Sequence, residues 1–111
     1  FSQIVALHSS QTYQVFMMGF LPGFPYLGIL PKSLRTKRKR TPNPFIPKGS
    51  VAIAGNQTGV YPSDSPGGWH VIGKTPIQIF DSKQLHSFHF HVGAEVNINA
   101  ISKKEFHEFN Q

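Results

Sequence analysis

Residues 19–49 concentrate the amino acids that interrupt regular structure. This stretch holds six of the nine prolines and four of the ten glycines. A helix interior cannot continue through proline at this density, because proline removes a backbone donor and its ring clashes with the preceding turn. A helical bundle is therefore not expected, and the sequence predicts a turn-rich β fold. We expect residues 19–49 to form an ordered but irregular excursion, packed by Phe20, Phe24 and Tyr26.

Length and composition narrow the class of protein. At 111 residues we expect one domain over residues 1–111, and ten phenylalanines supply a core. The absence of cysteine excludes a disulfide scaffold, a thiolate zinc site and a cysteine nucleophile. No apolar run reaches the ~18 residues of a membrane span, and no signal peptide is visible, so we expect a cytoplasmic protein without membrane contact. The start at Phe1 suggests the C-terminal part of a longer chain whose N-terminal domain is absent.

The positive charge sits in one segment. Residues 32–40 carry six basic side chains and no acid, whereas the remainder holds five basic and five acidic residues and is neutral. Such a segment could contact phosphates or an acidic partner, or could simply be a solvated loop. We expect no nucleic-acid binding, because no aromatic residues alternate with the basic ones.

Several short segments have the alternation of half-buried strands. The predicted strands are Tyr13–Met18, Ser50–Ala54, His70–Gly73, Ile77–Phe80, residues 88–92 and Glu95–Ile101. Residues 4–7 could be either a helix end or a strand. Strand Ser50–Ala54 is expected to break into a Gly/Asn turn, and residues 61–76 are expected to form an irregular loop that leads into the strand at His70–Gly73. Strands this short favour a barrel or a sandwich, and a closed barrel leaves no exposed edges.

Two local patterns carry more specific predictions. In Ser50–Ala54, Ala52 and Ala54 place small side chains on one face, so we expect a bulky group to approach that face. Ser102 and Glu105 have the spacing of a capping box, which predicts a short C-terminal helix burying Phe106 and Phe109.

The sequence offers little for metal binding or for catalysis by this chain alone. His86, His89 and His91 could form a metal set, but Phe88 and Phe90 claim the core face of that strand, so we expect a solvated histidine pair and no metal. Of the five carboxylates, neither Asp64 nor Asp81 has a second acid or a histidine at a spacing suited to acid–base chemistry. No phosphate-cradling glycine pattern is present.

Three segments rich in glycine, proline and aromatic residues remain as a candidate site. They are residues 19–28, 55–59 and 61–69. Proline fixes loop shape, the neutral polar side chains donate and accept hydrogen bonds, and the aromatic rings supply flat apolar walls. This composition suits a preformed pocket for a neutral amide-like or peptide-like ligand. It suits equally well a set of loops that cap the barrel ends with their aromatic residues in the core.

The same segments carry a family resemblance. Residues 16–31 (FMMGFLPGFPYLGILP) and 46–76 (IPKGSVAIAGNQTGVYPSDSPGGWHVIGKTP) resemble the allophanate hydrolase subunit 1 family of carboxyltransferase-type domains. The likeness extends from about His8 to the end of the chain. That family includes the B subunit of bacterial 5-oxoprolinase and KipI, an inhibitor of a sporulation histidine kinase.

The resemblance implies a mainly β, cyclophilin-like closed barrel with long Gly/Pro-rich loops. It also implies one component of an ATP-dependent 5-oxoprolinase, which opens 5-oxo-L-proline to L-glutamate. This component would bind substrate or intermediate with a sister subunit of the C (allophanate hydrolase subunit 2) type and with an A-type partner, and would be inactive alone. ATP and Mg²⁺ would be handled by the wider complex, with no cofactor bound by this domain. The alternative is a KipI-type inhibitor that docks on a histidine kinase and blocks its autophosphorylation.

The matched motifs also imply which residues form the site. The candidates for substrate or partner binding are Phe20, Pro22, Gly23, Phe24, Tyr26, Arg38, Asn56, Gln57, Thr58, Tyr61, Ser65, Gly67, Gly68 and Trp69. This chain departs from the family where Asn43 and Phe45 replace two expected arginines, while Arg38 keeps a basic residue where the family tends to have one. The departure weakens the expectation of an anionic ligand and leaves a docking role open.

Overall fold

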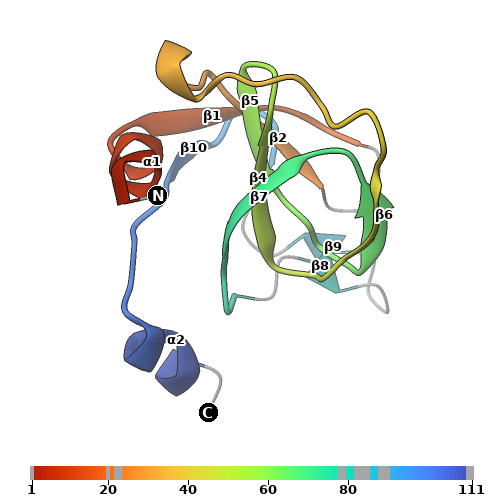
Figure 1. The fold of residues 1–111 in the computed structure, drawn as a ribbon. Coiled ribbons are helices and arrows are strands. Elements are labelled where there is room, and N and C mark those ends of the chain that lie inside the picture. The colour runs from red at the N-terminus through yellow and green to blue at the C-terminus, as the bar shows by residue number, and fades with distance from the viewer. Residues whose placement is uncertain are drawn as a thin grey trace.

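A computed structural model describes residues 2–19, 21, 24–77, 80–81, 86–87 and 91–109 of the chain. Its main body is a six-stranded antiparallel sheet with the strand order β10-β1-β2-β5-β4-β7 (Figure 1). These strands are β1 (Thr12–Met18), β2 (Pro25–Gly28), β4 (Ser50–Ala54), β5 (Gln57–Val60), β7 (His70–Lys74) and β10 (Glu95–Asn97).

Two strand pairs and three helical segments complete the described structure. The pairs are β3 (Asn43–Ile46) with β6 (Ser65–Gly67) and β8 (Phe80–Asp81) with β9 (His86–Ser87). The helical segments are α1 (Ser2–Ser9), the 3₁₀ turn η1 (Lys32–Leu34) and α2 (Lys103–Phe109). Within the described residues, neither α-helix has the length and apolar character needed to cross a bilayer.

The mainly β class is confirmed. The ladders between described residues run from β10 at one edge to β7 at the other, and none of them joins these two edges. Closure into a barrel therefore stays a prediction.

The sheet buries a different cluster on each face. Ile53 lies with Tyr13, Val15 and Leu27 in one buried cluster. Ala52 and Ala54, which alternate with Ile53, lie in a second cluster with Phe24, Tyr61 and Trp69. The prediction that bulky groups approach the alanine face of β4 is confirmed.

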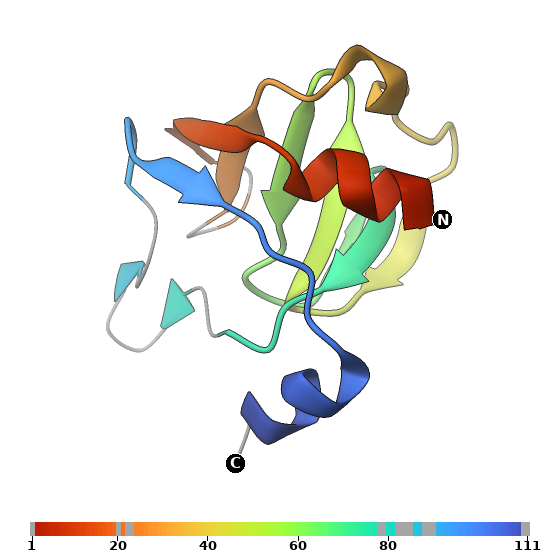
Figure 2. The same cartoon turned by 90° about the vertical axis from the view of Figure 1, so that its left-hand side faces the viewer.

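Helix α1 covers the Ile53 face. Residues 4–7, for which the sequence allowed a helix end or a strand, are helical, and Ile4 packs against the cluster of Tyr13 and Ile53. Figure 2 shows α1 crossing in front of the sheet. At the end of the helix His8 is buried, which fixes α1 to the strands behind it.

The prediction that residues 19–49 are irregular throughout was wrong. Strand β2 lies in the middle of the sheet, between β1 and β5. Proline is tolerated there because Pro25 is the first residue of the strand, where the loss of one backbone donor interrupts the ladder least. Phe24 is buried and Tyr26 half-buried, as the packing argument required, and Phe20 lies outside the described residues.

Other segments differ from the sequence predictions in extent. The predicted Gly/Asn turn is confirmed at Gly55 and Asn56, with a positive φ of 57° at Gly55, and residues 57–60 after it form β5. Residues 65–67 form β6 within the expected loop. Strand β10 ends at Asn97 because its partner β1 begins at Thr12, opposite Asn97. The predicted strands at Ser50–Ala54 and His70–Gly73 are confirmed, whereas residues 78–79 and 88–90 of two others lie outside the described residues.

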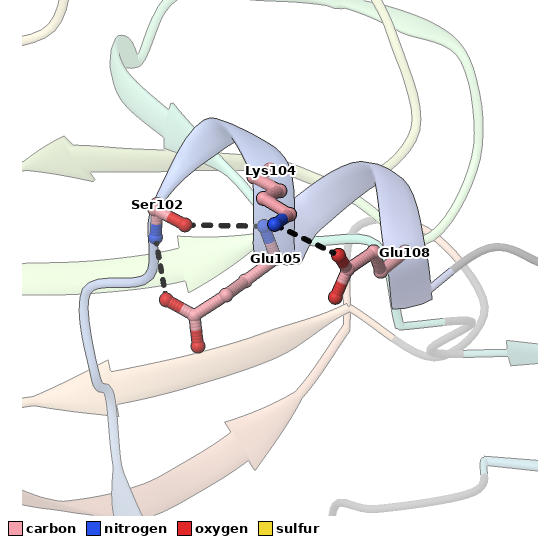
Figure 3. A network of polar contacts seen from close by, with 4 residues as sticks. All are labelled: Ser102, Lys104, Glu105 and Glu108. Atoms are coloured by element: carbon pink, nitrogen blue, oxygen red, sulfur yellow. Dashed lines mark hydrogen bonds and ion pairs between the residues drawn. The ribbon is translucent and has the colours of Figure 1, made fainter.

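The capping box of α2 is confirmed. The Ser102 hydroxyl accepts a hydrogen bond from the Glu105 amide at 3.1 Å, and the Glu105 carboxylate accepts one from the Ser102 amide at 3.2 Å (Figure 3). Phe106 is only half-buried, so the expected full burial was wrong for this residue, and the side chain of Phe109 is outside the described set. The reason is that α2 stands apart from the sheet in both views (Figures 1 and 2).

Because α2 gains little from packing, its cap should matter more than usual. We expect Ser102→Ala to lower the local stability of α2 by about 1 kcal/mol, since the Glu105 amide loses its acceptor and the reciprocal bond is weakened. Amide hydrogen exchange of residues 105–109 measures this loss. Ser102→Thr keeps the hydroxyl and is the matched control. Equal protection in the alanine and threonine variants would contradict the role of the cap.

Candidate functional site

Four aromatic rings from three separate segments meet on the alanine face of β4. Phe24 is the residue before β2 and Tyr26 lies in that strand, Tyr61 is the residue after β5, and Trp69 is the residue before β7. We call these four residues the aromatic cluster. The Phe24 ring centroid lies 5.1 Å from Tyr26, 5.1 Å from Tyr61 and 5.3 Å from Trp69, and Tyr26 lies 5.8 Å from Trp69. Three of these contacts are edge-to-face, the arrangement that aromatic quadrupoles favour.

A glycine in β5 allows the rings to reach the sheet. A Cβ atom at Gly59 would lie 2.9 Å from two carbons of the Phe24 ring and 2.9 Å from the Pro25 carbonyl oxygen. Gly59 pairs with Ala52 on β4, so two small residues on neighbouring strands lie side by side beneath Phe24. The lack of a side chain at Gly59 therefore leaves the space on the sheet that the Phe24 ring occupies.

The cluster combines buried rings with a more accessible rim. Phe24 and Tyr61 have no exposed surface and Trp69 keeps 6%. Tyr26, Gly67 and Gly68 are partly accessible and Arg38 is exposed. The Cβ of Arg38 lies 3.7 Å from the position a Cβ would take at Gly68, and a Cβ at Gly67 would collide with the Tyr61 hydroxyl. A ligand arriving here would meet the rim before it met Phe24 or Tyr61.

Burial governs the ionisation of Tyr61. Desolvation raises the pKa of its phenol above 10.0, while the nearby Arg38 charge and a hydrogen bond from the Trp69 backbone lower that pKa. Because desolvation dominates, the phenol stays neutral at physiological pH. Tyr61 therefore cannot serve as an anionic base there, and Arg38 supplies a positive charge at this rim.

The polar candidates of the 55–59 segment lie elsewhere. Asn56 and Gln57 are at the hairpin turn, and four residue steps along β5 separate Gln57 from Tyr61, about 13 Å. The Asn56 carbonyl accepts a hydrogen bond from the Leu30 amide at 2.8 Å. Thr58 is fully buried and pairs with Ile53, so it faces the opposite side of the sheet from Gly59.

Of the remaining candidates, Ser65 lies beside the aromatic cluster and three others are not described. Ser65 is buried in β6 opposite Ile46, a residue that belongs to the cluster of Phe24 and Trp69. Phe20, Pro22 and Gly23 lie outside the described residues. The structure thus brings eight of the predicted site residues together at the aromatic cluster and its rim: Phe24, Tyr26, Arg38, Tyr61, Ser65, Gly67, Gly68 and Trp69.

Sequence reasoning missed a buried polar link on the other face. The His8 Nε2 atom lies 2.7 Å from the Thr58 hydroxyl, which itself donates to the Ala52 carbonyl at 3.0 Å. The Thr58 hydroxyl has one hydrogen, which it donates to Ala52. The Nε2 atom of His8 therefore carries a hydrogen and donates it to the Thr58 oxygen. The Tyr13 hydroxyl donates to the His8 carbonyl at 2.6 Å. No local signal marks this link, because 50 residues separate His8 from Thr58.

The buried His8 makes stability depend on pH. Burial lowers the pKa of His8 below 6.5, so the folded protein binds fewer protons than the unfolded chain. We expect stability to be fully present above about pH 6.5 and to decline as the pH falls towards the lower folded pKa. Urea unfolding at several pH values measures this decline. In His8→Gln, which retains a donor but does not titrate, the decline should be smaller; an equal decline would place its origin in other groups.

One member of the predicted histidine pair lies among the described residues. His91 is exposed, whereas His89 lies outside the described residues. Within the part of the chain that is described, no three His, Asp or Glu side chains are grouped to hold a metal ion.

Comparison with known proteins agrees with the motifs at this site. Residues 1–90 match the family described as carboxyltransferase domain, subdomain C and D. The chain is 43% identical over 109 residues to the B subunit of 5-oxoprolinase from Bacillus subtilis (strain 168), covering 98% of this chain and 45% of that protein. It is 56% identical over 79 residues to the B subunit of 5-oxoprolinase from Escherichia coli O157:H7, covering 71% of this chain and 36% of that protein.

A solved structure shares the fold as well. The conserved uncharacterized protein PH0987 from Pyrococcus horikoshii superposes with a TM-score of 0.86 at 40% identity, over 95% of this chain and 49% of that one. The chain thus spans less than half the length of each of these relatives.

Proposed function

Since the chain belongs to the family of carboxyltransferase domains, subdomain C and D, we propose that it is part of the B subunit of an ATP-dependent 5-oxoprolinase. The observation that carries this proposal is the 43% identity to a protein of that name over 98% of the chain. The motif Gly67-Gly68-Trp69 lies within the matched region, and it contributes two glycines to the rim and one buried ring to the aromatic cluster. The reaction would open the lactam of 5-oxo-L-proline to give L-glutamate.

In this proposal the domain binds and positions, and other subunits supply the chemistry. Activation of ATP requires Mg²⁺, which proteins hold through carboxylates together with the nucleotide phosphates. The chain has five carboxylates, and one of them, Asp64, accepts a hydrogen bond from the Lys48 amide at 2.8 Å. The sister subunits of type A and C would therefore handle ATP and Mg²⁺, and orientation of the substrate would be the contribution of this chain.

The rim offers groups that fit such a substrate. A lactam carboxylate needs a cation, and the exposed Arg38 beside Gly68 supplies one. The half-buried Tyr26 and the partly accessible backbone of Gly67 could meet the cyclic amide. A cyclophilin-like barrel remains part of the proposal, supported by the strongly curved sheet in Figure 1.

Reconstitution tests the proposal. The full-length protein is combined with the A and C subunit homologues of the same genome, and glutamate release from 5-oxoproline and ATP is assayed with and without it. We expect activity to require the protein, and Arg38→Ala to raise the KM for 5-oxoproline, while Lys103→Ala on α2 leaves it unchanged. Activity independent of the protein would contradict the proposal. Inhibition of a sporulation kinase's autophosphorylation by the same protein would then favour the kinase-docking alternative.

A further inference from the structure

Residues 32–40, which we call the basic strip, carry six basic side chains and no acidic one. All six of its basic side chains are exposed. Among the described residues, the one salt bridge joins Lys104 to Glu108 on α2. None of the strip's six cations therefore forms a salt bridge with a described residue. Unpaired like charges repel one another, and an acidic partner would relieve that repulsion.

The strip is held in place through its backbone. The Thr36 carbonyl accepts a hydrogen bond from the Gly55 amide at 2.5 Å, and the Lys37 carbonyl accepts one from the His70 ring at 2.8 Å. The Lys39 amide donates to the Gly68 carbonyl at 2.7 Å. At its start Leu34 is buried in the core. The cations are therefore presented on a fixed path, which reduces the ordering entropy that binding would otherwise cost.

The path crosses the sheet where β4 ends and β7 begins. Its bonds to Gly55 and Gly68 place it between the hairpin turn and the rim of the aromatic cluster. Four extended residue steps from Thr36 to Arg40 cover about 13 Å. A single carboxylate or phosphate group cannot pair with cations spread over this width, so the strip fits a surface carrying several negative charges.

The nature of the adjoining groups favours a protein surface over a nucleic acid. Binding of single strands relies on exposed rings that stack on bases. Beside the strip, the rings of Tyr61 and Trp69 are buried, and the partly exposed His70 ring is held by its hydrogen bond to the Lys37 carbonyl. An α-helix or a two-stranded ribbon is the element that enters the groove of a duplex. Residues 32–40 form neither, and their regular structure is the short 3₁₀ turn η1. Relatives of this chain are named as one subunit of an enzyme, which provides a partner surface.

We propose that the basic strip docks on an acidic surface of another subunit of the assembly. This inference rests on the proposed function, because it takes the partner from the same complex. Electrostatic attraction would speed the encounter and set the orientation of the two subunits. Docking there would bring the partner next to Arg38 and Gly68, so the rim of the aromatic cluster would face the interface between them.

Charge reversal tests the docking. The full-length protein carrying Lys37→Glu and Lys39→Glu is compared with wild type for binding to the purified A and C subunit homologues by titration calorimetry. The strip's anchors are backbone atoms, so these substitutions should leave its path unchanged, and circular dichroism checks the fold. We expect binding to weaken about tenfold or more. The matched control, Lys74→Glu with Lys103→Glu, makes the same change in net charge elsewhere and should stay within about threefold of wild type.

Salt provides an independent measurement. Wild-type affinity should fall between about 0.05 and 0.5 M NaCl, and the strip variant should show a weaker dependence. An affinity that changes neither with salt nor on charge reversal would contradict docking through the basic strip and would leave the proposed function standing. Failure of the wild-type protein to bind either homologue would count against the proposed function itself. Strip-dependent binding of an oligonucleotide that outcompetes the protein partners would overturn the inference in favour of a nucleic acid.

Discussion

Phe24→Ala should lower the free energy of unfolding by about 3–5 kcal/mol, the usual cost of truncating a buried phenylalanine. The Phe24 ring has no exposed surface and packs against Tyr26, Tyr61 and Trp69. Its removal leaves a cavity bordered by three rings and by Gly59, and a close-packed core relaxes into such a cavity only in part. Urea denaturation followed by circular dichroism gives the free energy directly.

A second phenylalanine provides the control for this change. Phe16 on β1 is 46% exposed, so Phe16→Ala should cost about 1 kcal/mol or less. The sequence left open whether the aromatic residues line a ligand pocket or cap the core. A Phe24→Ala protein that keeps wild-type stability but loses affinity for 5-oxoproline or for the other subunits would show that the ring is a ligand wall. A large stability loss supports its place in the core.

Gly59→Ala should be the second costly substitution, at about 1–3 kcal/mol of stability. The new methyl group would lie 2.9 Å from the Phe24 ring and 2.9 Å from the Pro25 carbonyl oxygen. The ring could tilt, but the carbonyl belongs to a β2 backbone that is paired on both sides, so the strand itself would have to move. The measurement is the same urea titration.

Gly73→Ala is the matched control, because Gly73 also lies in a strand of this sheet. A Cβ atom there would have no atom within 4 Å, and alanine should be tolerated or slightly stabilising. Gly59 is buried in the central strand β5 and Gly73 is exposed in the edge strand β7, so the comparison sets a methyl group that has no room against one that enters open space. Equal stability of the two variants would show that β2 and β5 can separate without cost.

Local patterns in the sequence were sufficient for some elements. Strand β4 was predicted to the residue, because Val51 and Ile53 alternate with alanines between two turns. The capping box at Ser102 was predicted for a similar reason, since all of its bonds lie within four residues. In both cases the forces that fix the element act between near neighbours.

Other elements depend on partners far along the chain. Strand β2 carries a proline and a glycine in four residues, and only its position between β1 and β5 makes it a strand. Strand β5 contains Gly59, which resembles a turn residue locally and in the sheet provides space for Phe24. The link from His8 to Thr58 spans 50 residues and leaves no trace in either local pattern.

The candidate site shows the same division. Phe24, Tyr61 and Trp69 were all expected at one site, and the sheet brings their rings together. Proximity in the motif did not place Asn56 and Gln57 among these rings, because the β4–β5 hairpin directs its turn away from Tyr61. The basic strip gained a defined position only through bonds to Gly55 and Gly68, which no charge pattern could predict.

Trp69 is the sole tryptophan of the chain, and its indole sits almost fully shielded among Phe24 and Tyr26. Its intrinsic fluorescence is therefore an optical reporter of one small region. Emission should be blue-shifted in the native protein, and the two nearby phenols should transfer excitation energy to it. Any event that loosens this corner, whether the arrival of a protein partner or the entry of a substrate, can be followed in real time without an added dye.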